Sequence, residues 1–192
     1  MTIFLILAPY GAFALLMLVT SAAVSLFAAA GVCLAVIVLD AVRGRSTKIL
    51  GAGSAILFAV IGSYQTLVDP ALGKSTVKLL VDAGMFMIAS GSMLLRRPFT
   101  LQYALEAVHA ETAAMPGFLR ANYIITGVWT AAMLTMMLSN VMMLYIPGLP
   151  LWSGLAIAFA ARNSAVYFTK WYPAYRRMKY GRPPVDALPK MH

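Results

Sequence analysis

The sequence predicts an all-α protein, a polytopic transmembrane bundle of about six helices joined by short loops, with both termini in the cytoplasm. Composition is the first reason: 61% of the 192 residues are hydrophobic and 11% are charged, whereas soluble domains are about half apolar and a quarter charged. A water-soluble fold of this length cannot hide so much apolar surface, but a bilayer accepts it. The second reason is that the Lys and Arg residues gather in a few short segments between long apolar runs.

The first apolar run, residues 1–39, contains no charged side chain. At about 1.5 Å per residue it is too long for one helix across a hydrocarbon core of about 30 Å. We predict two spans, about 2–19 and 21–39, with a turn near Thr20. Two alternatives stay open, namely one long tilted helix with an interfacial segment and a cleaved signal peptide. The lack of Lys and Arg in the first residues disfavours the signal peptide.

The third and fourth spans, about 50–68 and 78–95, are apolar runs separated by a short polar connection that starts at Asp69-Pro70. Small residues at the start of the third span allow neighbouring helices to approach closely. The fourth span is expected to end at Arg96-Arg97-Pro98, because proline lacks an N–H group and restricts the residue before it.

A short amphipathic helix at about 100–110 is expected to lie on the membrane surface, because its apolar residues recur at helical spacing. The fifth and sixth spans, about 121–145 and 151–171, follow and are joined by an uncharged hairpin. The bundle therefore occupies residues 1–172. Residues 173–192 are expected to form a flexible basic cytoplasmic tail that contacts anionic lipid headgroups.

The basic residues predict the orientation, because cytoplasmic loops of membrane proteins are enriched in Lys and Arg. The residues expected to set the topology and to contact lipid are Arg43, Arg45, Lys48, Arg96, Arg97, Arg176 and Arg177. Six spans place them all on one side, which predicts a multi-pass protein of a bacterial inner membrane. The net charge of +9 belongs to these segments and not to a groove-shaped face, so no nucleic-acid partner is predicted.

Five polar side chains fall inside the predicted spans or at their ends. They are Asp82, Arg162, Asp40, Gln65 and Asn140. Ionisable groups are costly in hydrocarbon and usually have a reason to be there. One interpretation makes Asp82 and Arg162 a polar centre for a proton or an anion. The other pairs Asp82 with Lys78, one helical turn away, lets Arg162 extend toward the inner surface, and uses Gln65 and Asn140 as hydrogen bonds between helices.

The sequence contains no glycine-rich phosphate loop, no metal-ligand spacing and no Ser/His/Asp set, so no catalytic residue, metal or cofactor is predicted. The single cysteine, Cys33, rules out an intramolecular disulfide bond. Methionines are frequent in the fifth span, but no His or Cys accompanies them. We therefore interpret them as packing residues and not as copper ligands.

Several motifs occur in the order found in a known family. They are Val42-Arg43-Gly44-Arg45, Asp69-Pro70 followed by Lys74 and Lys78, Arg96-Arg97-Pro98-Phe99, and Arg120-Ala121-Asn122 followed by Trp129 and Asn140. With this order over about residues 1–170, the chain resembles the intracellular septation protein A family of bacterial inner-membrane proteins. Ala121 stands where that family usually has leucine, and the basic tail is additional. The resemblance implies a role in envelope maintenance or division-site organisation through contacts with other membrane proteins, with no known catalytic residue.

Three functions remain open. The first is a non-enzymatic membrane protein that acts through helix–helix contacts, in cell-envelope maintenance or as an accessory subunit of a larger complex. Short loops and small-residue helix faces favour it. The second is a small transporter or channel built around Asp82 and Arg162. The third is an integral enzyme acting on lipids, which would need a polar lateral cleft with Glu106 or Glu111 at its mouth.

Overall fold

A computed structural model describes residues 2–115, 117–146 and 148–180, with side chains from residue 8 onward except at 151, 155 and 180. All regular structure in these residues is helical. The helices in chain order are α1 (Thr2–Val19), α2 (Ala22–Val42), α3 (Ile49–Leu67), α4 (Lys74–Leu94), α5 (Phe99–Ala107), α6 (Ala110–Ala113), α7 (Phe118–Tyr145) and α8 (Leu151–Tyr180).

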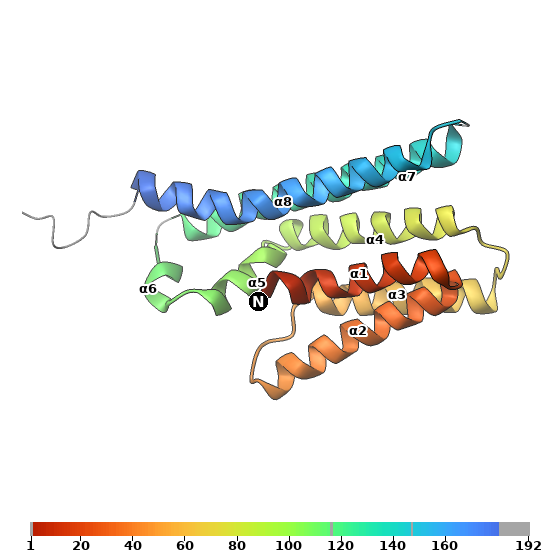
Figure 1. Cartoon of the computed structure of the whole chain (residues 1–192). Helices are drawn as coiled ribbons and strands as arrows, with labels where there is room; N and C mark the ends of the chain where they lie inside the picture. Colours follow the sequence, from red (N-terminus) through yellow and green to blue (C-terminus); the bar gives the residue numbers. More distant parts are fainter. Residues whose placement is uncertain (1, 116, 147, 181–192) are drawn as a thin grey trace, which may run out of the picture.

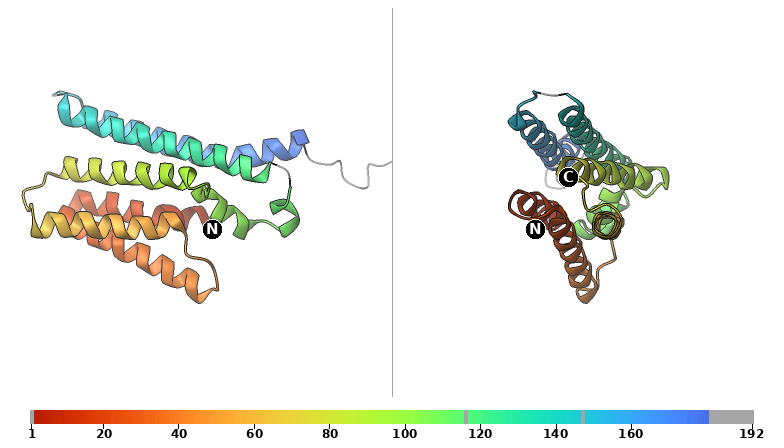
Figure 2. Two further views of the ribbon diagram at one scale, coloured as in Figure 1. Left: turned by 180° about the vertical axis from the view of Figure 1, so that it is seen from behind. Right: turned by 90° about the vertical axis from the view of Figure 1, so that its right-hand side faces the viewer.

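The long helices run side by side, with α4 in the middle of the molecule (Figures 1 and 2). On one side of α4 lie α1, α2 and α3, and on the other side lies the α7–α8 pair. Helix α4 packs against both α3 and α7, so it joins the two groups. The chain enters and leaves successive helices at opposite ends of the bundle, as expected for a protein whose helices cross a layer repeatedly.

The apolar start of the chain forms two helices, α1 and α2, and not one long tilted helix. The break falls at Thr20-Ser21, where the Ser21 side chain caps α2 by accepting a hydrogen bond of 3.3 Å from the backbone N–H of Val24. A serine in this position satisfies one of the backbone donors that a helix leaves unpaired at its N-terminus. A local capping signal therefore divides the apolar run.

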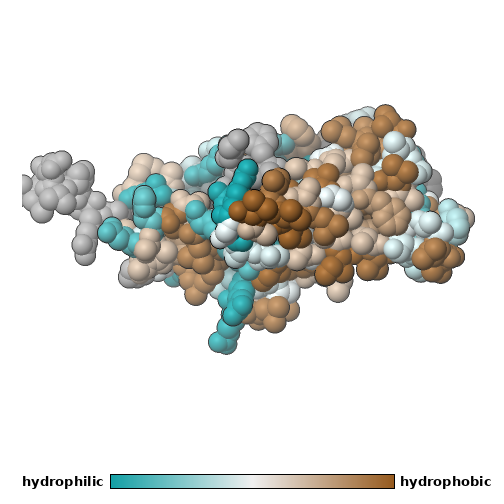
Figure 3. All heavy atoms as spheres, turned by 90° about the horizontal axis from the view of Figure 1, so that it is seen from below, coloured by the Kyte–Doolittle hydropathy of each residue, from teal (hydrophilic) through white to brown (hydrophobic). Residues whose placement is uncertain are grey.

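Four helices are long and apolar enough to cross a membrane, namely α2, α3, α4 and α7, and the described apolar part of α1, Ala8–Val19, is shorter. Large apolar side chains that are at least half exposed occur on all six long helices. Examples, one from each helix, are Leu15, Val38, Ile56, Met87, Leu138 and Phe159. Hydrophobic residues cover much of the face in Figure 3, whereas hydrophilic ones gather toward the end that contains α5. Such a surface is costly in water and suited to lipid.

One end of the bundle collects the α2–α3 loop, α5, α6 and the end of α8 (left in Figure 1). The basic residues between Arg43 and Lys48 and in the last part of α8 lie in these segments, and Arg96-Arg97 lie in the connection directly before α5. We call this end the basic end. At the opposite end Lys74 donates to the carbonyl oxygens of Met17 and Thr20, each at 3.0 Å. A cation here stabilises the C-terminus of α1.

The expected surface helix at about 100–110 corresponds to α5, which is shorter and is attached to the bundle. Its first backbone N–H, that of Phe99, donates to the Ser92 hydroxyl at 3.1 Å. The Thr100 hydroxyl contacts the Thr126 hydroxyl at 2.7 Å, which ties α5 to α7. Phe99 is buried. Helix α5 therefore closes the basic end of the bundle.

The last helix differs from its expected limits. We expected the span to end at about residue 171 and a flexible tail to begin at 173, but α8 continues through Pro173 to Tyr180. Stacked aromatic pairs one turn apart, Phe168 with Tyr172 and Trp171 with Tyr175, support the helix on both sides of the proline. The remainder of the expected tail, residues 181–192, lies outside the described residues.

Candidate functional site

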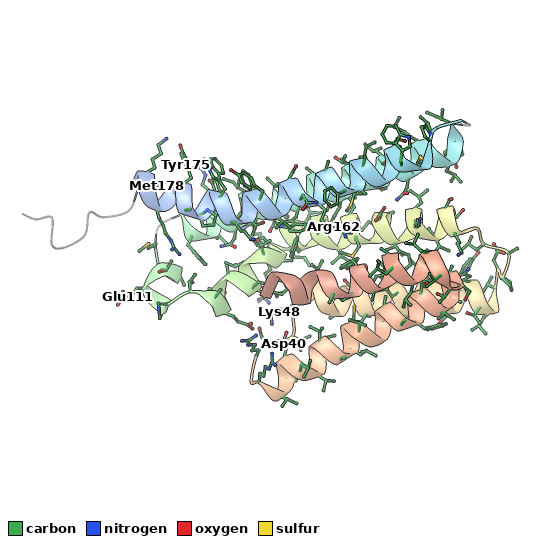
Figure 4. All side chains as sticks on the ribbon, in the orientation of Figure 1. Asp40, Lys48, Glu111, Arg162, Tyr175 and Met178 are labelled. Atoms are coloured by element: carbon green, nitrogen blue, oxygen red, sulfur yellow. The ribbon has the colours of Figure 1, made fainter. Side chains whose placement is uncertain are left out.

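The most concentrated polar cluster lies at the basic end and is centred on Lys48, which immediately precedes α3. Its side chain is only 5% exposed. The Lys48 ammonium lies 2.8 Å from Asp40 Oδ2 and 3.1 Å from Glu106 Oε2, and it also donates to the Ser46 carbonyl oxygen at 3.3 Å. Figure 4 shows Asp40 and Lys48 close together at this end. A buried ammonium needs such partners, because an unpaired charge in the interior is costly.

Backbone geometry brings the cluster together. Helix α2 ends at Val42, and Gly44 adopts a left-handed conformation with φ of +67°, which glycine accepts without strain. This turn directs the chain back, and the Arg45 backbone N–H donates to the Asp40 carbonyl oxygen at 2.8 Å. The Arg45 guanidinium lies 3.8 Å from Asp40 and 4.0 Å from Glu106 and is partly exposed. Two cations therefore share two carboxylates.

Helix α5 contributes the remaining side chains of the cluster, next to those from the end of α2 and from the residues before α3. Gln102 and Glu106 lie one turn apart on the same face of α5. The Gln102 side-chain oxygen accepts a 2.7 Å hydrogen bond from the backbone N–H of Ile49, the first residue of α3. The Lys48 ammonium also lies 5.4 Å from the centre of the Tyr103 ring, within the range of a cation–π contact. Burial, with a smaller effect of the nearby Asp40 charge, raises the pKa of Tyr103 above its ordinary value, so its hydroxyl stays protonated.

A cavity of about 40 Å³ lies beside this cluster. Its polar lining comes from Asp40, Arg45, Thr47, Lys48 and Tyr103 at the basic end and from Tyr10 and Ser54 inside the bundle; apolar residues and Cys33 form the rest. The Tyr10 hydroxyl is hydrogen-bonded to the Ser54 hydroxyl. A polar pair thus stands between α1 and α3 in an otherwise apolar region.

Around Asp82, the hydrogen bond between helices expected of Asn140 is present, whereas the expected pairing with Lys78 is not. Asp82 accepts a 2.5 Å hydrogen bond from the Asn140 amide, so it is joined to α7. Lys78 makes no ion pair with Asp82 at contact distance. Arg162 is half-buried midway along α8 (Figure 4). Among the described residues we find no hydrogen bond or ion pair to it.

The other predicted polar residues take separate positions. Gln65 is buried, and its amide donates to the Leu72 carbonyl oxygen at 3.4 Å, so it fastens the α3–α4 connection and not another helix. Of the residues expected to contact lipid, those that are exposed are Arg43, Arg45, Arg96, Arg97 and Arg177. Arg176 is half-buried and donates to the Gly117 carbonyl oxygen at 2.7 Å, linking the end of α8 to the start of α7. Lys48 is also one of the residues expected to contact lipid, but its side chain is buried.

Sequence reasoning missed the part played by Glu106, Tyr103 and Tyr10. Glu106 was considered only as a residue at the mouth of a lipid-binding cleft; it pairs with Lys48, while Glu111 is exposed on α6. The signal that was present is the polar face of α5, where Gln102 and Glu106 are four residues apart. Within the described part of the chain, no three His, Cys, Asp or Glu side chains come together as metal ligands would.

The fold and the polar clusters define a class: an all-helical protein with helices suited to cross a membrane and with buried charge pairs at one end. No family model, curated protein or solved structure matches the chain.

Proposed function

We propose that this chain is a six-span protein of a bacterial inner membrane that acts through helix–helix contacts with other membrane proteins and carries out no catalysis itself. Helices α1 and α8 would complete the membrane bundle with the four helices that meet the length and hydropathy criteria. The basic end would face the cytoplasm, because basic segments are retained there. Both termini would then be cytoplasmic.

The observation that carries this proposal is the division between the interior and the outer faces of the bundle. At the basic end Lys48 pairs with Asp40 and Glu106, and within the bundle Asp82 is hydrogen-bonded to Asn140. The outward faces are mostly large apolar side chains. In a bilayer these faces meet lipid or other helices, and packing decides which.

The resemblance to the intracellular septation protein A family gives the proposal its cellular context. We propose a role in envelope maintenance or at the division site, either alone or as an accessory subunit of a larger complex. The contacts would be made with other membrane proteins, and anionic headgroups would contact the basic end.

Two measurements test this function. Deleting the gene in its native host is expected to change cell length or envelope permeability, and cross-linking before extraction in mild detergent is expected to recover a membrane protein in a fixed ratio to this chain. Reciprocal capture from the partner must return this chain. An unaltered envelope together with a chain recovered only by itself would disprove the proposal.

A small transporter or channel is the second candidate, and the position of Arg162 favours it. Arg162 is half-buried midway along α8 (Figure 4). A guanidinium near the middle of a bilayer attracts anions and carboxylates. Such a centre would lie between the two helix groups.

The transport candidate is tested by flux into proteoliposomes that contain the full chain. Transport predicts a flux above that of empty liposomes, its loss in Asp82→Asn and Arg162→Ala, and its retention in Asn163→Ala, whose exposed amide bonds only the Phe159 carbonyl oxygen of its own helix. If the two variants leave both the flux and the fold unchanged, the polar centre has no transport role.

A further inference from the structure

The cavity at the basic end is large enough for water. A buried water molecule needs about 10–15 Å³ of cavity volume that a water-sized sphere can enter, and it needs two to four polar partners. The cavity measures about 40 Å³, which corresponds to roughly three water molecules on that scale. Its lining contains charged and hydroxyl groups at both ends, so these partners are present. An apolar cavity of the same volume would stay dry.

The polar lining reaches from the end of the bundle into its apolar interior. Lys48 precedes α3, and Ser54 lies six residues further along the chain, which places it about 9 Å deeper at the usual rise of an α-helix. Ser54 donates to the Leu50 carbonyl oxygen at 2.5 Å and is also bonded to the Tyr10 hydroxyl. Hydroxyl oxygens accept two hydrogen bonds, so Tyr10 and Ser54 retain acceptor capacity toward the cavity.

Three members of the charged cluster, Asp40, Arg45 and Lys48, line the same cavity, and Glu106, which is not part of the lining, lies 3.1 Å from the Lys48 ammonium. Lys48 bridges Asp40 at the end of α2 and Glu106 of α5. It thereby links three parts of the chain: α2, the start of α3 and α5. Loss of the ion pair between Lys48 and Glu106 would separate Lys48 from α5, while the ion pair between Lys48 and Asp40 of α2 would remain.

We propose that the cavity is a hydrated chamber, and that the Lys48–Glu106 ion pair closes it toward the basic end. Water inside the chamber hydrogen-bonds to Asp40, Tyr10 and Ser54. The chamber goes beyond the proposed function and exists whether or not the bundle carries a solute. Its ligand is water.

The first test asks whether the wild-type chamber holds water. A short radiolytic pulse forms hydroxyl radicals from bound water, and these modify adjacent side chains of the full chain in lipid nanodiscs. Cys33 lines the cavity, whereas Met17 is equally well buried outside it. Relative to the unfolded chain, Cys33 is expected to be modified several-fold more than Met17. Equal protection of the two would overturn the proposal.

The second test concerns the closure and uses two matched variants. Glu106→Gln removes the carboxylate next to Lys48, and Glu111→Gln removes an exposed carboxylate on α6. Cys33 is the only cysteine of the chain, so the rate at which its thiol forms a mixed disulfide with a small polar methanethiosulfonate, releasing methanesulfinate, reports access to the chamber. Glu106→Gln is expected to accelerate this reaction roughly tenfold, a change in the opening equilibrium of about 1.4 kcal/mol, and Glu111→Gln is expected to match the wild type. Equal rates in all three proteins would overturn the closure, while the wild-type radiolysis tests hydration without any substitution.

Discussion

Replacing Lys48 by methionine is expected to destabilise the protein strongly, because it removes the cation that two buried or partly buried carboxylates share. Breaking a buried ion pair by removing one partner costs about 3–5 kcal/mol. Arg45 remains within 4.0 Å of both carboxylates and compensates in part. The expected loss in the free energy of unfolding is therefore at the lower end of that range, about 3 kcal/mol.

Arg45→Met is the matched control, since it removes a second cation from the same carboxylates. The Arg45 side chain is 42% exposed and its contacts are 3.8 and 4.0 Å long. Exposed pairs contribute about 0.2–1 kcal/mol, so this variant is expected to lose less than a third of what Lys48→Met loses.

The assay is equilibrium unfolding of both variants in mixed micelles at one pH and salt concentration, followed by circular dichroism. Adding Asp40→Asn to Lys48→Met is expected to restore part of the stability, because the unpaired charge is then removed as well. Equal losses in Lys48→Met and Arg45→Met, or no loss in either, would refute the assignment of Lys48 as the centre of the cluster.

Two other predictions concern the interfaces of α4. A Cβ atom at Gly84 would lie 2.3 Å from a side-chain carbon of α3, whereas one at Gly91 would meet nothing within 4 Å. Gly84→Ala is therefore expected to lower the free energy of unfolding by about 1–3 kcal/mol. Gly91→Ala is expected to raise it by about 0.5–1 kcal/mol through helix propensity. Thermal unfolding in detergent checks both variants, and a less stable Gly91→Ala than Gly84→Ala would contradict the packing. Asn140→Ala removes the amide that donates to Asp82 and is expected to cost about 0.6–2 kcal/mol in the same assay, while Asn163→Ala is expected to leave the midpoint unchanged.

The residues at which most helices begin and end could be predicted from the sequence. Helices α3 and α7 follow apolar runs whose ends are marked by prolines, glycines or charges, and such local signals act without knowledge of the neighbours. Local sequence signals did not predict the extension of α8 to Tyr180. Pro173 predicts a helix end, but the stacked aromatic side chains and the Arg176 contact with Gly117 stabilise the extension.

The polar cluster around Lys48 could be predicted only in part from the sequence. The sequence predicts Asp40 as an ionisable group at the end of a span, but it places Lys48 among the residues expected to contact lipid. The pairing of Lys48 with Glu106 joins residues far apart in the sequence, and no local pattern encodes which surface helix folds back onto which loop. The same holds for Asp82, whose partner proved to be Asn140 of α7 and not Lys78 of its own helix.

Hydropathy and chain breaks are enough to predict that this chain forms apolar helices suited to a membrane, because both are local properties that act through the solvent. The tertiary structure decided the arrangement of its polar groups. Once α4 packs between α3 and α7 and α5 folds across the basic end, Lys48 pairs with Asp40 and Glu106, because a charge buried at that position without a partner would be costly.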